Sequence, residues 1–70
     1  MTRFNLKGVE YIELIKLLKL LHITPTGGQA KIMVESGEVK LNGQTEFRKR
    51  AKLRAGDIVE TRGKKITIEP

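Results

Sequence analysis

The spacing of the apolar residues changes once along this chain, at about Glu38. Before this point the apolar residues recur with the period of a helix, and after it they alternate with polar residues as they do in strands. We therefore expect helices first and short strands second. With 70 residues and no cysteine, the chain can form one small compact domain, residues 1–70, without disulfide bonds.

The first helix is expected over residues 9–21, because the bulky apolar residues gather on one side when this stretch is placed at helical spacing. Ile12 and Leu20 fall on the opposite, polar side, so a second layer or a partner is expected to cover them. The helix cannot extend far past His22. Pro25 disfavours helical geometry at the residue before it and lacks a backbone N–H group.

A second, short helix is predicted to follow. Thr26 is a favourable N-cap residue, and Gln29 occupies the capping-box position three residues later. Gly37 stands where a residue in the left-handed conformation would end the helix. The buried stripe of this helix is expected to consist of Ala30, Met33 and Val34.

The second half of the chain is predicted to form short strands. Residues 39–41 alternate between apolar and polar, the Asn42-Gly43 pair is typical of a tight hairpin turn, and residues 44–47 are expected to return from it. Further strands are expected at Ile58-Val59 and over residues 66–68. The sequence therefore predicts an α+β fold, in which a two-helix hairpin is followed by a small antiparallel sheet of short strands.

Positive charge is concentrated in the second half of the chain. There are 14 Lys and Arg against 8 Asp and Glu, for a formal net charge of +6. Five cations fall within seven residues, and we call residues 48–54 the basic run: Arg48, Lys49, Arg50, Lys52 and Arg54. Like charges at this spacing favour a polyanionic partner, although a solvated loop that only maintains solubility is the alternative. Leu53 is expected to attach the run to the core.

Residues that carry catalytic or metal chemistry are scarce. His22 is the only histidine and there is no cysteine, so we expect no metal site, no cofactor and no enzymatic activity. No apolar stretch approaches the ~20 residues that span a bilayer. A cytoplasmic, soluble protein with no membrane partner and no small-molecule substrate is therefore predicted.

The glycine pair Gly27-Gly28 at the start of the second helix allows two interpretations. Glycines at a helix N-terminus let a ligand approach the free N–H groups, which favour an anion such as an RNA phosphate. Alternatively, the glycines only permit tight packing of the two helices. The surrounding residues lack the spacing of a nucleotide-binding phosphate loop.

Residues 26–43 carry, in order, a helix cap, an alanine, a glycine, a strand and an Asn-Gly turn. This segment resembles the core signature of the RNA-binding domain named after small-subunit ribosomal protein S-four, and the match extends from about Glu13 to Glu60. More closely, the chain resembles the small stand-alone bacterial members of that family, of the YbcJ type. The shared residues are Glu13-Leu14, Leu17-Leu18-Lys19, the segment from Gly27 to Lys31, and Arg48-Lys49-Arg50.

The resemblance implies a motif of the αL type, in which the two helices and the following strand form the RNA-contacting face. The positions that match the family's RNA contacts are Gly27, Gly28, Lys31, Lys40, Arg48, Lys49, Arg50, Lys52 and Arg54. Two departures stand out: Gly27 replaces the usual arginine beside the helix cap, and Glu13-Leu14-Ile15 replaces the usual Arg-Leu-Asp. Because a familiar RNA contact is lost, the basic run is expected to carry more of the binding.

The function predicted from these observations is binding of structured RNA, of the ribosomal or transfer RNA class, by a monomer. Lys and Arg would contact phosphates, and the three aromatic residues are too few for a protein that binds single strands by stacking bases. The alternative is a protein-interaction module that docks an acidic partner. A sulfur-carrier role is disfavoured because the chain ends in Ile68-Glu69-Pro70 rather than Gly-Gly.

Overall fold

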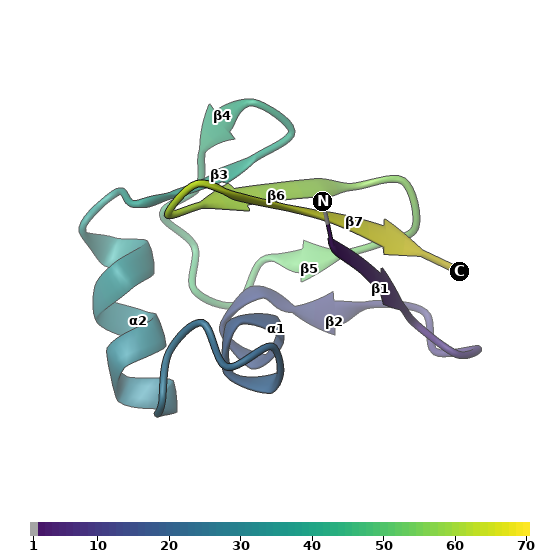
Figure 1. Cartoon of the computed structure of the whole chain (residues 1–70), viewed down its shortest axis with the longest axis horizontal. Coiled ribbons are helices and arrows are strands. Elements are labelled where there is room, and N and C mark those ends of the chain that lie inside the picture. The colour runs from purple at the N-terminus through teal and green to yellow at the C-terminus, as the bar shows by residue number, and fades with distance from the viewer. Residues whose placement is uncertain (1) are drawn as a thin grey trace.

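The computed structural model describes residues 2–70. It is built from two helices and seven short strands: β1 (Thr2–Asn5), β2 (Ile12–Glu13), α1 (Leu14–Leu20), α2 (Gly27–Glu35), β3 (Val39–Leu41), β4 (Gln44–Thr45), β5 (Lys52–Leu53), β6 (Ile58–Thr61) and β7 (Lys64–Glu69). A five-stranded sheet has the order β1-β7-β6-β3-β4, and β2 pairs with β5 separately. Both helices lie on one side of the larger sheet (Figure 1). The predicted α+β fold is confirmed.

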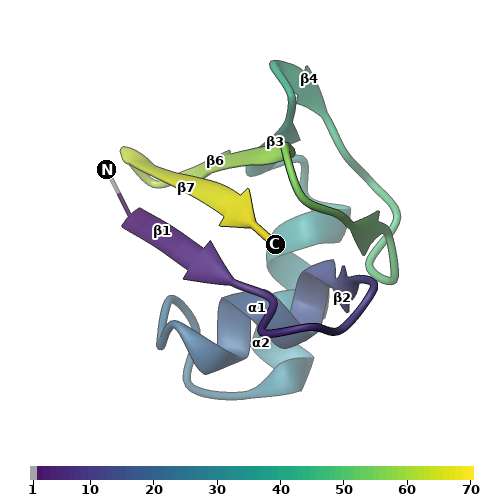
Figure 2. The same ribbon diagram turned by 90° about the vertical axis from the view of Figure 1, so that its right-hand side faces the viewer.

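The larger sheet is mixed rather than wholly antiparallel, because β1 pairs parallel to β7. Figure 2 shows the two strands side by side and pointing the same way. The pattern of the sequence indicates no strand at residues 2–5. Phe4 lies opposite Ile68 and packs partly against the core, and Leu6 directly after the strand is buried, so β1 is held by contacts with the far end of the chain.

Helix α1 begins at Leu14, five residues later than predicted. Ile12 and Glu13 instead form β2, in which Ile12 lies opposite Leu53 of β5, and both side chains are buried. The second layer expected over Ile12 is therefore supplied by the chain itself. Leu20, the other apolar residue on the polar side, remains 51% exposed.

Helix α2 follows the sequence prediction at both ends. The Thr26 hydroxyl accepts a hydrogen bond of 3.2 Å from the Gln29 backbone N–H group, which caps the start. At the end, Gly37 adopts φ 83°, and the N–H groups of Gly37 and Glu38 donate to carbonyls of the last turn. This is the Schellman arrangement, which a glycine allows without strain. The predicted stripe is buried: Ala30, Met33 and Val34.

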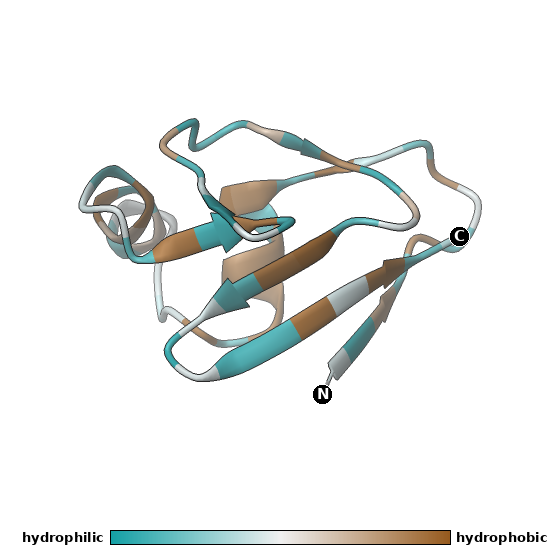
Figure 3. Cartoon of the chain, turned by 90° about the horizontal axis from the view of Figure 1, so that it is seen from above, coloured by the Kyte–Doolittle hydropathy of each residue, from teal (hydrophilic) through white to brown (hydrophobic). Residues whose placement is uncertain are grey.

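The core lies between the helices and the sheet. Figure 3 shows apolar residues on the middle strands and on the helix beneath them. The fully buried large side chains come from both helices, β3, β5, β6 and β7: Leu14, Leu17, Leu18, Met33, Val34, Val39, Leu53, Val59, Ile66 and Ile68. Over residues 2–70, neither helix has the length and apolar character needed to cross a membrane.

Candidate nucleic-acid interface

The basic run is fixed against the start of α1. The Leu14 and Ile15 N–H groups have no partner inside the helix, and they donate to the Ala51 and Lys49 carbonyls at 3.0 and 3.1 Å. Ala51 and Leu53 point into the core and are buried, which confirms the role expected for Leu53. Four of the five cations of the run are exposed, and Lys49 is partly exposed. The run is therefore an ordered surface rather than a loose solvated loop.

Three carboxylates offset the charge of the basic run. The ion pairs are Arg48 with Glu46, Lys49 with Glu35, and Arg54 with Glu10. Within residues 2–70, Arg50 and Lys52 have no carboxylate at ion-pair distance. Five cations against three carboxylates leave a local surplus of two positive charges. The exposed side chains of Arg50 and Lys52 carry this surplus.

The pair of Glu46 and Arg48 has the most defined geometry. Both oxygens of the Glu46 carboxylate accept a hydrogen bond of 3.0 Å from the Arg48 guanidinium, and Oε2 also accepts one from the Arg48 backbone N–H group. The hydrogen-bonded guanidinium lowers the pKa of Glu46 below its ordinary value, and the carboxylate raises the pKa of Arg48. Arg48 is thus held in one orientation at the start of the run.

Lys31 and Lys49 come together although they are far apart in the sequence. Lys31 lies on the exposed side of α2, and the Lys49 ammonium lies 3.9 Å from Glu35, one helical turn further along. The neighbouring Lys31 ammonium lowers the pKa of Lys49, and the attraction of Glu35 only partly opposes this. Two ammonium groups at close distance repel each other, and an anion that binds to both offsets this repulsion. A phosphate group is such an anion.

Tyr11 joins the other end of the basic run. In the antiparallel pair of β2 and β5, Glu13 lies opposite Lys52, so Tyr11 faces Arg54 on the outer side of the ribbon. The Lys52 ammonium lies 5.0 Å and the Arg54 guanidinium 5.6 Å from the centre of the Tyr11 ring. These cation–aromatic contacts were missed in the sequence, where residues 9–21 were expected to form a helix.

The two glycines at the start of α2 leave open space. A Cβ atom at Gly27 would meet no other atom within 4 Å, and one at Gly28 would meet only the Thr26 hydroxyl at 3.9 Å. Tight packing of the two helices therefore does not explain them. The Gly27 and Gly28 N–H groups have no acceptor inside the helix, whereas the Gln29 N–H group donates to the Thr26 hydroxyl.

Lys40 lies apart from the other predicted site residues. It is exposed on the outer face of the sheet, where its neighbours across β4 and β6 are Thr45 and Glu60. None of the hydrogen bonds or ion pairs found over residues 2–70 joins Lys40 to the basic run or to Lys31.

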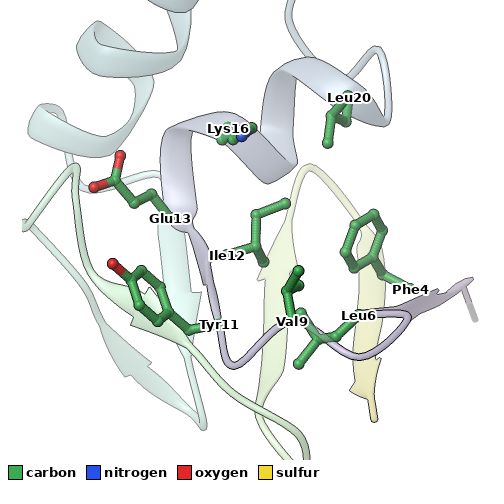
Figure 4. A pocket seen from close by; sticks show the side chains of 8 residues that line it. All are labelled: Phe4, Leu6, Val9, Tyr11, Ile12, Glu13, Lys16 and Leu20. Atoms are coloured by element: carbon green, nitrogen blue, oxygen red, sulfur yellow. The ribbon is translucent and has the colours of Figure 1, made fainter.

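A groove of about 430 Å³ lies beside α1, on the side of β2 that faces β1 (Figure 4). Its walls are mostly apolar, and they are formed by Phe4, Leu6, Val9, Tyr11, Ile12, Glu13, Lys16 and Leu20. One lysine and one glutamate balance each other there, so the groove lacks the positive charge that a phosphate backbone requires. The basic run and the exposed side of α2 remain the candidate interface.

A family model described as the S4 domain matches residues 4–69. The chain belongs to the S4 domain family. This confirms the resemblance found in residues 26–43.

Relatives of this S4 domain include two curated bacterial proteins. The putative RNA-binding protein YbcJ of Escherichia coli is 40% identical over 68 residues, which cover 97% of each chain. The probable ribosome maturation protein RlbA of Bacillus subtilis is 39% identical over 54 residues, which cover 77% of this chain and 76% of that protein.

Two solved structures share the fold. The solution structure of E. coli YbcJ, described as revealing an αL motif involved in RNA binding, covers all of this chain and 89% of its own, with 38% identity and a TM-score of 0.76. The trimeric structure of Vibrio cholerae heat shock protein 15 has 29% identity and a TM-score of 0.74, over 87% of this chain and 65% of its own.

Proposed function

We propose that this S4 domain protein binds structured RNA, of the ribosomal or transfer RNA class, through the phosphate backbone. The observation that carries the proposal is the basic run, which is fixed to α1 and presents Arg50 and Lys52 without carboxylate partners. An ordered row of cations suits a backbone of fixed geometry, such as that of a folded RNA. The descriptions of YbcJ and RlbA, an RNA-binding and a ribosome maturation protein, support the same function.

Apart from Lys40, the proposed contacts lie on α2 and on the basic run. They extend from the first turn of α2 over Lys31 and Lys49 to the cations around Tyr11. The residues proposed to contact RNA are Gly27, Gly28, Lys31, Lys40, Arg48, Lys49, Arg50, Lys52 and Arg54. Lys40 has the least support among them because it lies on the outer face of the sheet.

We propose that the protein binds as a monomer in the cytoplasm, where folded RNA is abundant. The V. cholerae relative is described as trimeric, so the mass of the protein should be measured by light scattering with and without RNA. A mass of one chain per RNA site is the expected result.

The test of RNA binding is a salt titration with an RNA hairpin, alongside single-stranded RNA and duplex DNA of matched length. About five phosphate contacts predict that the logarithm of the binding constant falls with the logarithm of salt at a slope of about −4. The hairpin should bind most tightly. A slope near zero would contradict the proposal, and equal binding to all three would reduce the face to a general polyanion surface.

The second candidate function is docking of an acidic protein, because the same cations could pair with carboxylates. Capture of partners from a cell extract, with and without ribonuclease, separates the two functions. Release of the partner by ribonuclease is expected for RNA binding. A partner that stays bound after ribonuclease treatment would favour the protein-docking function.

A further inference from the structure

Phe47 lies between β4 and the basic run, and its side chain is 61% exposed. Four other large apolar residues are exposed among those described, and three of them, Val9, Tyr11 and Leu20, line the groove beside α1. Phe47 is not part of that groove. Phe47 instead directly precedes the cations of the basic run in the chain, and this position sets it apart from an isolated apolar residue on a surface.

The backbone on both sides of Phe47 is fixed. The Glu46 N–H group donates to the Val39 carbonyl at 2.9 Å, and the Arg48 N–H group donates to the Glu46 carboxylate at 3.0 Å. The ring rests beside Gly37, where a Cβ atom would lie 3.4 Å from the Phe47 Cε1 atom. A ring that is already ordered loses little conformational entropy when a ligand packs against it.

The surroundings of Phe47 combine an aromatic surface with positive charge. Arg48 follows it directly, and Lys49 comes next and lies close to Lys31. In the described part of the chain, both cation–aromatic contacts involve Tyr11, so no cation covers the Phe47 ring. An uncovered ring beside phosphate-binding cations is the combination that binds an unpaired nucleotide, with the base on the ring and the phosphate on the cations.

We propose that Phe47 is a stacking site for one unpaired nucleobase that adjoins the RNA stem held by the basic run. This inference rests on the proposed RNA-binding function and narrows its target. The preferred RNA contains a bulge, a loop or an overhang next to a stem, and a fully paired duplex lacks the base that Phe47 would contact. One ring accommodates one base, which agrees with the small number of aromatic residues in the chain.

A Phe47→Trp variant tests the stacking directly, because the natural chain contains no tryptophan. We expect the fluorescence of this variant to be quenched by a hairpin with an unpaired nucleotide beside its stem, and not by a fully paired RNA with the same stem. Leu20→Trp is the matched control, since Leu20 is 51% exposed on α1 and lies outside the proposed interface. Its fluorescence should not change.

The affinity of Phe47→Ala gives a second, independent result. Loss of one stacked base should weaken binding of the hairpin about tenfold and leave binding of the paired RNA unchanged. Unfolding in urea verifies that this variant is folded. If both RNAs bind with steep salt dependence but neither the fluorescence nor the affinity responds, the stacking site is wrong and the RNA function stands. If the natural protein binds neither RNA, both proposals are wrong.

Discussion

The Glu46 carboxylate and the Arg48 guanidinium are joined by two hydrogen bonds of 3.0 Å, one on each carboxylate oxygen. The Glu46 side chain is only 12% exposed, whereas that of Arg48 is 78% exposed. A largely covered carboxylate therefore orients a cation that projects into solvent. This pairing fixes the first cation of the basic run and gives the stability of the protein a defined response to acid.

Stability should fall in acid partly because Glu46 becomes protonated. The Arg48 hydrogen bonds lower the pKa of Glu46 in the folded protein below its ordinary value of 4.5. The resulting stabilisation is present above pH 4.5 and is lost as the pH falls through the lowered pKa. At neutral pH, we expect Glu46→Gln to unfold at a lower urea concentration than the natural protein, and this difference should disappear in acid. A difference of the same size at every pH would contradict this assignment.

Lys31→Met should weaken RNA binding without destabilising the free protein. The neighbouring ammonium of Lys31 lowers the pKa of Lys49, so the charged form of Lys49 is disfavoured in the fold. This cost is present below the lowered pKa and disappears as the pH rises above the ordinary value of 10.5. Removing Lys31 should move the pKa of Lys49 upward, which NMR titration can follow. Lys64→Met is the control and should change neither the pKa of Lys49 nor RNA binding.

Gly27→Ala and Gly28→Ala test whether the two glycines serve RNA binding or the packing of the two helices. Both positions are helical and have room for a Cβ atom, and alanine is favoured over glycine inside helices by up to ~1 kcal/mol. We expect stability to be unchanged or slightly raised, while RNA binding weakens because the backbone is less accessible. Gly43→Ala is the contrasting control, since Gly43 has φ 86° and alanine there should destabilise the hairpin. Unchanged RNA affinity in both helix variants would remove the two glycines from the interface.

Replacing Arg48, Lys49 and Arg50 together by alanine should weaken RNA binding and leave the protein folded. Exposed cations contribute little to stability, so losing the hydrogen bonds of Arg48 to Glu46 should lower stability without unfolding the protein. If each of the three contacts one phosphate, the salt slope should become shallower by about 2 to 3. The control removes Lys7, Lys64 and Lys65, which lowers the net charge equally and should weaken binding less. Unfolding of the first variant would show that the basic run serves the structure instead.

Elements fixed by local rules were predictable from the sequence. The cap formed by Thr26 and Gln29, the left-handed Gly37 and the Asn42-Gly43 turn each depend on residues within a few positions of one another. These features place α2 and the following hairpin without reference to the rest of the chain.

Elements fixed by distant partners were not predictable in this way. Residues 9–13 have helical spacing, yet Ile12 pairs with Leu53, and this contact delays the start of α1. Strand β1 has its partner in β7 at the other end of the chain. Local propensity is weak in such segments, so tertiary contacts determine their structure.

The candidate site shows the same division. The five cations of the basic run were visible as a cluster, but the carboxylates Glu10 and Glu35 approach it only through the fold. The contacts of the Tyr11 ring with Lys52 and Arg54 were likewise not indicated by the sequence. The only sequence signal for these contacts would have been the alternation of apolar and polar residues along β2 and β5. With two residues in each strand, the alternation is too short to recognise.

The parallel pairing of β1 with β7 has a consequence for the order of folding. Thr2 lies opposite Ile66 and Asn5 opposite Glu69. The two strands can therefore pair only when the long segment that joins them has closed into a loop. Closing so large a loop costs entropy before any contact compensates for it, whereas the α2–β3–β4 segment closes locally. During synthesis, the five-stranded sheet therefore cannot be completed until the last residues of β7 have left the ribosomal exit tunnel.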